Sequence, residues 1–280
     1  MNRPLTNAGA WAKKAGGYLL LTLFGLWCLF PVYWMVITSI KPRIDTFAEP
    51  PIFFPLRYSA DAFNYVFRVL VQPGILNSIL VSTMSMFFVI IIGSMAGFGL
   101  SRIAFRGRKS LMSWILSLRM FPVVVVVIPI FAILRNLKLV DTLFALTFVY
   151  IGMNLPFTIW IMKTFFDEMP LEIEEAAHID GCSRKGVFFR IALPLAVPGL
   201  IAAAIFAFIF AWNEFLFALI LTRTKAVTAQ VRLASLESTG GIDWDRIAAL
   251  SAIIVVPVIL FSAFIQKNIV RGLTFGAIKE

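Results

Sequence analysis

The stretch Glu174-Glu175-Ala176-Ala177-His178-Ile179-Asp180-Gly181 is a charged island in a chain that is otherwise mostly apolar. Pro170, followed by acidic residues, predicts the start of a helix, because proline suits a first turn and carboxylates favour the positive end of the helix dipole. Gly181 predicts the end of that helix, and a second segment runs on to Pro194. We therefore expect a short helix–turn–helix within residues 163–194, with its turn exposed to water.

The composition excludes an ordinary soluble domain. Of 280 residues, 60% are hydrophobic and 14% are charged, so we expect the chain to bury its apolar surface in lipid. The net charge of +10 could indicate nucleic acid, but the basic residues are scattered between apolar runs, so we expect a membrane and no nucleic-acid partner. His178 is the only histidine, and Cys28 and Cys182 lie in unlike surroundings, so we expect neither a metal site nor a disulfide framework.

Long apolar runs predict an all-α membrane protein with six transmembrane helices, each judged against the ~20 residues that cross a bilayer. Pro122 and Pro129 interrupt the third run and predict a break in its helix. Gly93 and Gly97 form a small-x-x-x-small pattern that favours close helix packing. We expect residues 1–280 to form one membrane domain without a soluble domain. The predicted spans are 16–40, 76–100, 111–134, 142–162, 195–221 and 247–266.

The distribution of lysine and arginine predicts the orientation, since cytoplasmic loops of membrane proteins carry an excess of both. The short loop 101–110 gives the clearest signal. Its basic residues are Arg102, Arg106, Arg108 and Lys109. If this loop is cytoplasmic, the polar loop 163–194 is cytoplasmic too. We expect a multi-pass protein with its N- and C-termini in the cytoplasm.

The polar loop resembles the EAA loop of bacterial ABC-importer permeases. Glu175-Ala176-Ala177 is followed, in the register of that family, by Gly181 and by Ile191-x-Leu193-Pro194. Similarity to the carbohydrate, maltose-permease-like members extends over Trp212-Asn213-Glu214. Further similar stretches are Leu118-Arg119-Met120-Phe121-Pro122 and Gly272-Leu273-Thr274-x-Gly276-Ala277. The resemblance implies a type I (MetI-like) permease fold in the bacterial inner membrane.

The resemblance also implies a function. The chain would be one subunit of an ATP-driven importer that takes a sugar or sugar derivative from a periplasmic binding protein. Its partners would be a second, homologous permease subunit and two ATPase subunits that hold ATP and magnesium. The sequence has no phosphate-binding G-x-x-x-x-G-K-[ST] motif, so we expect no cofactor and no catalysis on this chain. The residues expected to couple it to the ATPase are Glu174, Glu175, Ala176, Ala177, Asp180 and Gly181.

Polar residues inside the predicted spans are candidates for the substrate pathway, because such groups are costly in lipid. The candidates are Trp212, Asn213, Glu214, Asn154 and Arg119. Trp212 could stack on a sugar ring while Asn213 and Glu214 bind hydroxyl groups, or the last two could lock this helix to its neighbours. Asn154 could line a pathway or make a helix–helix hydrogen bond. Arg119 could contact an anionic group, or it could be an interfacial anchor.

Two other classes of membrane protein remain open from the residues alone. One is half of a secondary transporter driven by an ion gradient, which would place acidic residues in its pathway; Glu214 is the only acid inside a predicted span. The other is a membrane assembly protein that transports nothing. The substrate also stays open among neutral sugars, polyols, uronates and sulfonated sugars.

Overall fold

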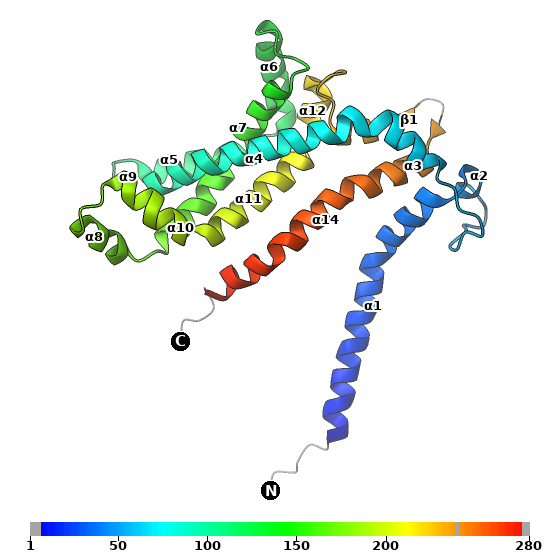
Figure 1. Cartoon of the computed structure of the whole chain (residues 1–280), viewed down its shortest axis with the longest axis horizontal. Helices are drawn as coiled ribbons and strands as arrows, with labels where there is room; N and C mark the ends of the chain where they lie inside the picture. The colour runs from blue at the N-terminus through cyan, green and yellow to red at the C-terminus, as the bar shows by residue number, and fades with distance from the viewer. Residues whose placement is uncertain (1–6, 239–240, 276–280) are drawn as a thin grey trace. The chain divides into compact units, whose positions relative to one another are not determined.

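The computed structural model describes residues 7–238 and 241–275 (Figure 1). It divides into two compact units. Unit 1 comprises Met1–Val69 and Leu236–Ile253, and unit 2 comprises Leu70–Ser235 and Ile254–Glu280. Both chain ends lie outside the described residues. The sequence predicted them to be on the cytoplasmic side of the membrane. Gly276 and Ala277 of the closing family-like stretch lie outside them as well.

The described part of the chain is helical apart from one short strand pair, which confirms the predicted all-α membrane fold. Unit 1 contains α1 (Asn7–Ile40), α2 (Arg43–Thr46), α3 (Asp61–Tyr65), most of η1 (Val66–Leu70) and the antiparallel strands β1 (Glu237–Ser238) and β2 (Gly241–Ile242). The last helix, α14 (Trp244–Phe275), begins in unit 1 and continues into unit 2.

Unit 2 contains the rest of the helices. They are α4 (Val71–Arg102), α5 (Arg108–Ser117), η2 (Leu118–Met120), α6 (Val123–Asn136), α7 (Leu143–Asp167), α8 (Leu171–Ile179), α9 (Arg184–Val187), η3 (Phe188–Ala192), α10 (Leu193–Leu195), α11 (Val197–Trp212), α12 (Leu216–Leu221) and α13 (Ala229–Ala234).

Helices long and apolar enough to cross a membrane occur throughout the described chain. Four are continuous: Lys14–Ile40, Pro73–Arg102, Leu143–Asp167 and Trp244–Ala263. Two more spans form only if bent pairs are counted, namely Arg108–Met120 with Val123–Asn136, bent by 91°, and Arg184–Leu195 with Val197–Trp212, bent by 76°. The first bend lies at Pro122, where the interruption was predicted, because proline cannot donate the hydrogen bond that continues a helix.

The run predicted as a fifth span, 195–221, is not one continuous helix. It is bent near its start, and it breaks again between α11 and α12 at residues 213–215. At this second break the Glu214 carboxylate accepts the backbone N–H groups of Phe217 (2.9 Å) and Ala218 (3.1 Å). These donors have no partner in a first helical turn, so the side chain stabilises a new helix start that hydropathy does not reveal.

Glycines bring α4 and α7 close together in unit 2. A Cβ added at Gly97 would lie 2.9 Å from the Lys163 backbone nitrogen, and one at Gly93 would lie 2.5 Å from Thr158 Cγ2. Any larger residue would force the helices apart. The close packing predicted from the Gly93–Gly97 pattern is therefore confirmed.

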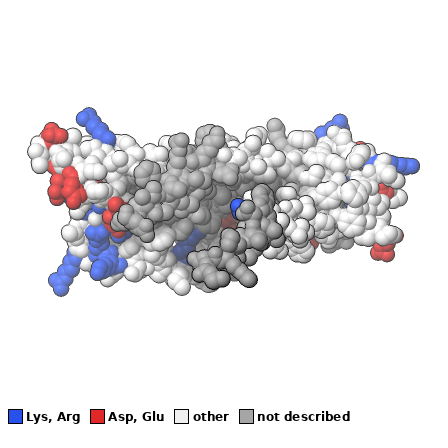
Figure 2. Space-filling model, turned by 90° about the horizontal axis from the view of Figure 1, so that it is seen from below, with Lys and Arg blue, Asp and Glu red and all other residues white. Residues whose placement is uncertain are grey.

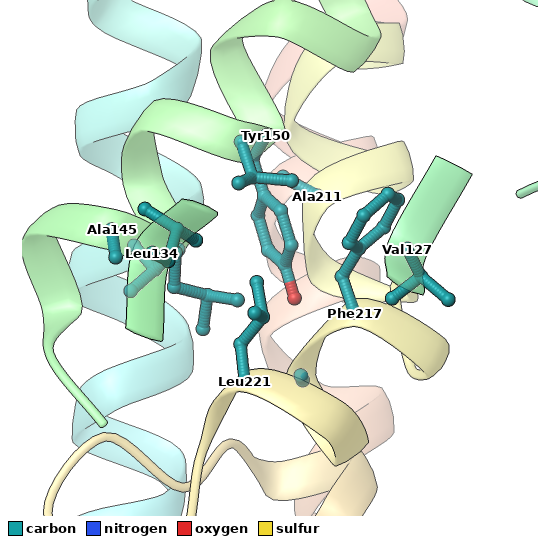
Figure 3. Packing of buried hydrophobic residues seen from close by; sticks show 11 residues of the cluster. Val127, Leu134, Ala145, Tyr150, Ala211, Phe217 and Leu221 are labelled. Atoms are coloured by element: carbon teal, nitrogen blue, oxygen red, sulfur yellow. The ribbon is translucent and has the colours of Figure 1, made fainter. Parts of the chain in front are cut away.

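The main apolar cluster of unit 2 lies where α6, α7 and α12 meet (Figure 3). Tyr150 on α7 is 1% exposed and points its hydroxyl group towards the α12 side chains Phe217 and Leu221 in this view. Val127 on α6 lies on the other side of Phe217. This packing holds the short helix α12 against two longer helices, and so positions the break at Glu214.

Asp141 lies in the loop between α6 and α7 and binds the segment that follows α12. Its carboxylate accepts the backbone N–H groups of residues 223–226 at 2.9 to 3.2 Å, and the Thr224 hydroxyl group at 3.1 Å. Its own N–H donates to the Leu221 carbonyl (2.8 Å). Partial burial pushes the pKa of Asp141 up, but the four backbone hydrogen bonds outweigh it, and the pKa lies well below its ordinary range. Asp141 is thus a clamp on the segment after α12.

Unit 1 is held together by polar contacts around the start of α14. Asp243 pairs with Arg43 and with Arg246, and the Arg246 guanidinium carbon lies 3.7 Å from the centre of the Tyr65 ring. The Tyr33 hydroxyl group donates to the Phe53 carbonyl (2.6 Å). These contacts fix the irregular stretch between α1 and α3, which the sequence marks only by its prolines and aromatic residues.

Candidate functional site

The helix predicted from Pro170 and Gly181 is α8, and local signals set both of its ends. Pro170 is the residue before its first turn, and Gly181 follows it with a φ of +86°, a left-handed conformation that suits glycine. The N–H of Cys182 donates to the Ala177 carbonyl (2.9 Å), which closes the helix end. A short polar turn then leads into α9.

The predicted coupling residues divide into an exposed set and a buried set. Glu175, Ala176, Asp180 and Gly181 are exposed, on one side of α8 and on the turn that follows. Glu174 and Ala177 are buried, and they are the only buried residues of this helix. Figure 2 shows blue and red side chains on the part of unit 2 where Figure 1 places α8 and α9. The exposed set is therefore accessible to another protein, while Glu174 faces its own chain.

Glu174 forms an ion pair that the sequence did not indicate. Its Oε1 accepts a hydrogen bond from Nε of Arg102, the last residue of α4, at 2.7 Å. The two side chains are 9% and 12% exposed, respectively. Arg102 also donates to the Met169 carbonyl (3.3 Å) and the Ser101 hydroxyl group (3.0 Å). The pair joins the start of α8 to the end of a long apolar helix.

A second candidate site is a cavity of about 780 Å³ within unit 2. Its walls come from η2, α6, α7, α11, α12 and the break that follows α11. Of the predicted pathway residues, Arg119, Asn154 and Glu214 line it, whereas Trp212 and Asn213 do not. Apolar and aromatic side chains form most of the remaining wall. They include Val126, Ile130, Phe148, Val149, Phe210 and Phe217.

Glu214 is held in place by its own chain. Besides the two backbone N–H groups at the start of α12, its Oε2 accepts the hydroxyl group of Tyr150 at 2.9 Å. The carboxylate therefore ties α7 to the break between α11 and α12. This geometry matches the helix-locking role that was left open for Glu214. Sequence reasoning missed Tyr150, because a tyrosine in an apolar helix carries no signal of its distant partner.

Arg119 lies on the cavity wall, over two aromatic rings that meet edge to face. Its guanidinium carbon is 4.3 Å from the ring centre of Phe210 and 5.1 Å from that of Phe157. One Nη donates to the Met153 carbonyl at 3.3 Å. No acidic side chain pairs with Arg119 among the described residues. The two rings orient the guanidinium group by cation–π contact, and its remaining N–H groups are available to a ligand or partner.

Of the remaining pathway candidates, Asn154 lines the cavity, whereas Trp212 and Asn213 do not. Trp212 is 1% exposed and stacks on Phe208 with ring centres 5.7 Å apart, so its ring cannot reach a sugar in the cavity. Asn213 is exposed and donates to the Ile209 carbonyl (2.9 Å). Asn154 donates to the Tyr150 carbonyl (3.0 Å) within α7 while lining the cavity.

In the described part of the chain, no group of three or more histidine, cysteine, aspartate or glutamate side chains is placed to hold a metal ion. The two sites are an exposed polar turn after α8 and a largely apolar cavity with a few fixed polar groups.

Comparisons with known proteins agree with this geometry. The family described as "Binding-protein-dependent transport system inner membrane component" matches residues 89–275. The trehalose/maltose transport system permease protein MalG of Thermococcus litoralis is 38% identical over 268 residues, covering 92% of this chain and 94% of that protein. The trehalose transport system permease protein SugB of Mycobacterium tuberculosis is 37% identical over 275 residues, covering 96% and 99%.

Solved structures extend the agreement to the fold. A chain from the crystal structure of a bacterial ABC transporter involved in the import of the acidic polysaccharide alginate superposes with a TM-score of 0.76. It is 23% identical and covers 95% of this chain and 99% of its own length, so it shows the shared fold alone. The family resemblance predicted from residues 175–194 is confirmed. The chain belongs to the binding-protein-dependent transport system inner membrane components, as a transmembrane permease of the ABC transporter class.

Proposed function

We propose that the chain is a permease subunit of an ATP-driven importer for a sugar or sugar derivative. The relatives named for trehalose and maltose transport support the cargo class, because they match this chain over more than nine-tenths of its length. As in the expectation from sequence, residues 1–280 form one multi-pass domain of a bacterial inner membrane, with both termini cytoplasmic. A second, homologous permease subunit completes the pathway.

Energy enters through partner subunits. Two ATPase subunits bind ATP and magnesium, and this chain itself binds no cofactor. The observation that carries this proposal is the exposed turn of α8, where Glu175, Ala176, Asp180 and Gly181 face outward beside a left-handed glycine. Small side chains at two of these positions let a partner backbone approach closely. A periplasmic binding protein delivers the cargo at the opposite face.

The cavity of unit 2 is the proposed cargo path of this subunit. Arg119, Asn154 and Glu214 place polar groups on a wall that is otherwise largely apolar, as small-molecule sites commonly do. Glu214 shapes the wall through its bonds to α12 and Tyr150, while Arg119 points donors towards a ligand. Trp212 and Asn213 lie next to the break but do not line the cavity. Alternating access opens this cavity to one side of the membrane at a time.

The test uses the complex reconstituted in nanodiscs with its ATPase and binding protein. Gly181→Asp puts a charged side chain on the exposed turn and should abolish ATPase stimulation by the cargo-loaded binding protein. Gly107→Asp is the matched control, because Gly107 also has a positive φ, +91°, and open space around its Cβ. Normal stimulation in the Gly181 variant would refute the docking role of this turn.

A further inference from the structure

Few side chains of the helix α8 pack against the rest of the chain. Its apolar side chains Leu171, Ile173 and Ile179 are exposed, and only Glu174 and Ala177 are buried. Ala177 offers a single methyl group. The orientation of α8 is therefore fixed mainly by the ion pair between Glu174 and Arg102. A force applied to the exposed turn must reach the membrane helices partly through this pair.

The pair is one half of a wider polar network at the ends of three helices. Ser101, next to Arg102, donates to Asp167 Oδ1 at 2.6 Å, and Asp167 is the last residue of α7. Asp167 also pairs with Lys163 and, at 3.5 Å, with Arg108 at the start of α5. Arg102 bonds to Ser101 as well as to Glu174. The network thus connects α8 to the ends of α4 and α7 and to the start of α5.

The chemistry of arginine suits a fixed mechanical joint. A planar guanidinium group with several donors binds a carboxylate in a defined orientation, which a flexible lysine does not. Arg102 uses three of its nitrogens on three acceptors, Glu174, Met169 and Ser101. Exposed ion pairs contribute little, but this pair is mostly buried, so breaking one side leaves a desolvated charge without a partner.

We propose that Arg102 is a positioning residue for coupling. Its ion pair with Glu174 fixes the angle of α8 on the ends of α4 and α7, and so passes displacement of α8 to the membrane helices. This inference rests on the proposed function, because it assumes that the exposed turn docks on an ATPase. Glu174 was predicted to belong to the surface that contacts the ATPase. In this proposal it instead connects α8 to the rest of the permease.

The experiment uses the full complex in nanodiscs and measures ATP hydrolysis with and without cargo-loaded binding protein, together with cargo transported per ATP hydrolysed. Arg102→Gln should lower the stimulation ratio on the order of 10-fold, within the range of coupling between distant sites. Arg106→Gln is the matched control, since Arg106 is an exposed arginine of the same loop. The apparent KM for ATP should stay unchanged, because the ATP site lies on another subunit.

Charge exchange tests whether the ion pair, rather than either side chain alone, carries the coupling. The double variant Arg102→Glu with Glu174→Arg restores opposite charges, and should recover part of the stimulation that Glu174→Arg alone loses. If Arg102→Gln does not assemble, this recovery in the double variant decides the question. Recovery supports the joint, and an assembled double variant that stays uncoupled overturns it.

Failure of this inference can be told apart from failure of the proposed function. If Gly181→Asp abolishes stimulation while Arg102→Gln assembles and is stimulated normally, the turn docks but Arg102 is not a joint. If neither variant affects stimulation, the proposed docking itself fails, and the inference falls with it.

Discussion

Removing the Asp141 carboxylate should release the segment that follows α12. The perturbations are Asp141→Asn, which removes the charge and keeps one acceptor oxygen, and Asp141→Ala, which removes both. Asparagine also tolerates the positive φ of this residue, +62°, better than alanine does. The two variants therefore separate the loss of charge from the loss of every acceptor.

The magnitude follows from the bonds that the clamp makes. Hydrogen bonds to charged groups contribute about 1.5–3 kcal/mol each. Water replaces part of them in a half-exposed loop, so we take the cost of Asp141→Asn as one such bond, about 1.5 kcal/mol. For Asp141→Ala we expect about 3 kcal/mol, since the loop keeps no side-chain acceptor and alanine adds strain.

Trypsin offers a direct assay, because Arg223 and Lys225 lie in the clamped segment. Cleavage of a folded protein follows the population of the locally opened state when opening is fast. A loss of about 1.5 kcal/mol then speeds cleavage roughly 10-fold, and about 3 kcal/mol roughly 100-fold. Lys138→Ala is the matched control, in the same loop and at a similar φ of +58°. Equal cleavage rates in all the proteins would refute the clamp.

The same clamp predicts a pH dependence. Because the pKa of Asp141 is lower in the folded state, the clamp stabilises the protein fully at pH values above the ordinary aspartate pKa of about 3.9. The stabilisation is lost as the pH falls further and the folded carboxylate takes up a proton. The difference in Tm between the unmodified protein and Asp141→Asn should therefore narrow below about pH 4. A constant difference would contradict this reasoning.

Further substitutions test the packing and the cavity. Gly97→Ala should cost about 1–3 kcal/mol by overpacking α4 against α7, whereas Gly99→Ala, with open space around its Cβ, should lower Tm little or not at all. Tyr150→Phe should cost about 1 kcal/mol in thermal unfolding, because Glu214 loses one of its hydrogen bonds; an unchanged Tm would show that this bond is not needed. Arg119→Lys should reduce uptake while the complex still assembles, since lysine keeps the charge but not the planar group with several donors that lies over the two rings. Normal uptake would remove Arg119 from the cargo path.

Local features of the chain were predictable from the sequence. The α8 helix and its turn depend on Pro170 and Gly181, which act on their immediate neighbours. The close approach of α4 and α7 depends on Gly93 and Gly97, where missing side chains leave room. The bend before α6 lies at Pro122, where a backbone donor is missing. In each case the residue type itself carries the structural consequence.

Contacts between distant residues were not predictable in this way. Glu174 was grouped with its exposed neighbours, but its partner Arg102 is 72 residues away, and that pairing buries it. The sequence marked Glu214 as a costly residue in lipid, but it did not indicate the hydrogen-bond partner Tyr150, which is 64 residues away. Trp212 was one candidate for stacking on a sugar ring, but it packs on Phe208 and does not line the cavity.

The division has one physical reason. Hydropathy, proline and glycine act through lipid transfer and backbone geometry, which are properties of a short stretch, so the sequence by itself determined the membrane class, most of the helices and the family. Whether a polar side chain lines a cavity, caps a helix or pairs with a buried charge depends on which helices lie beside it. The packing of unit 2 alone decided that Glu174 faces inward to Arg102 while Glu175, one residue further, faces out.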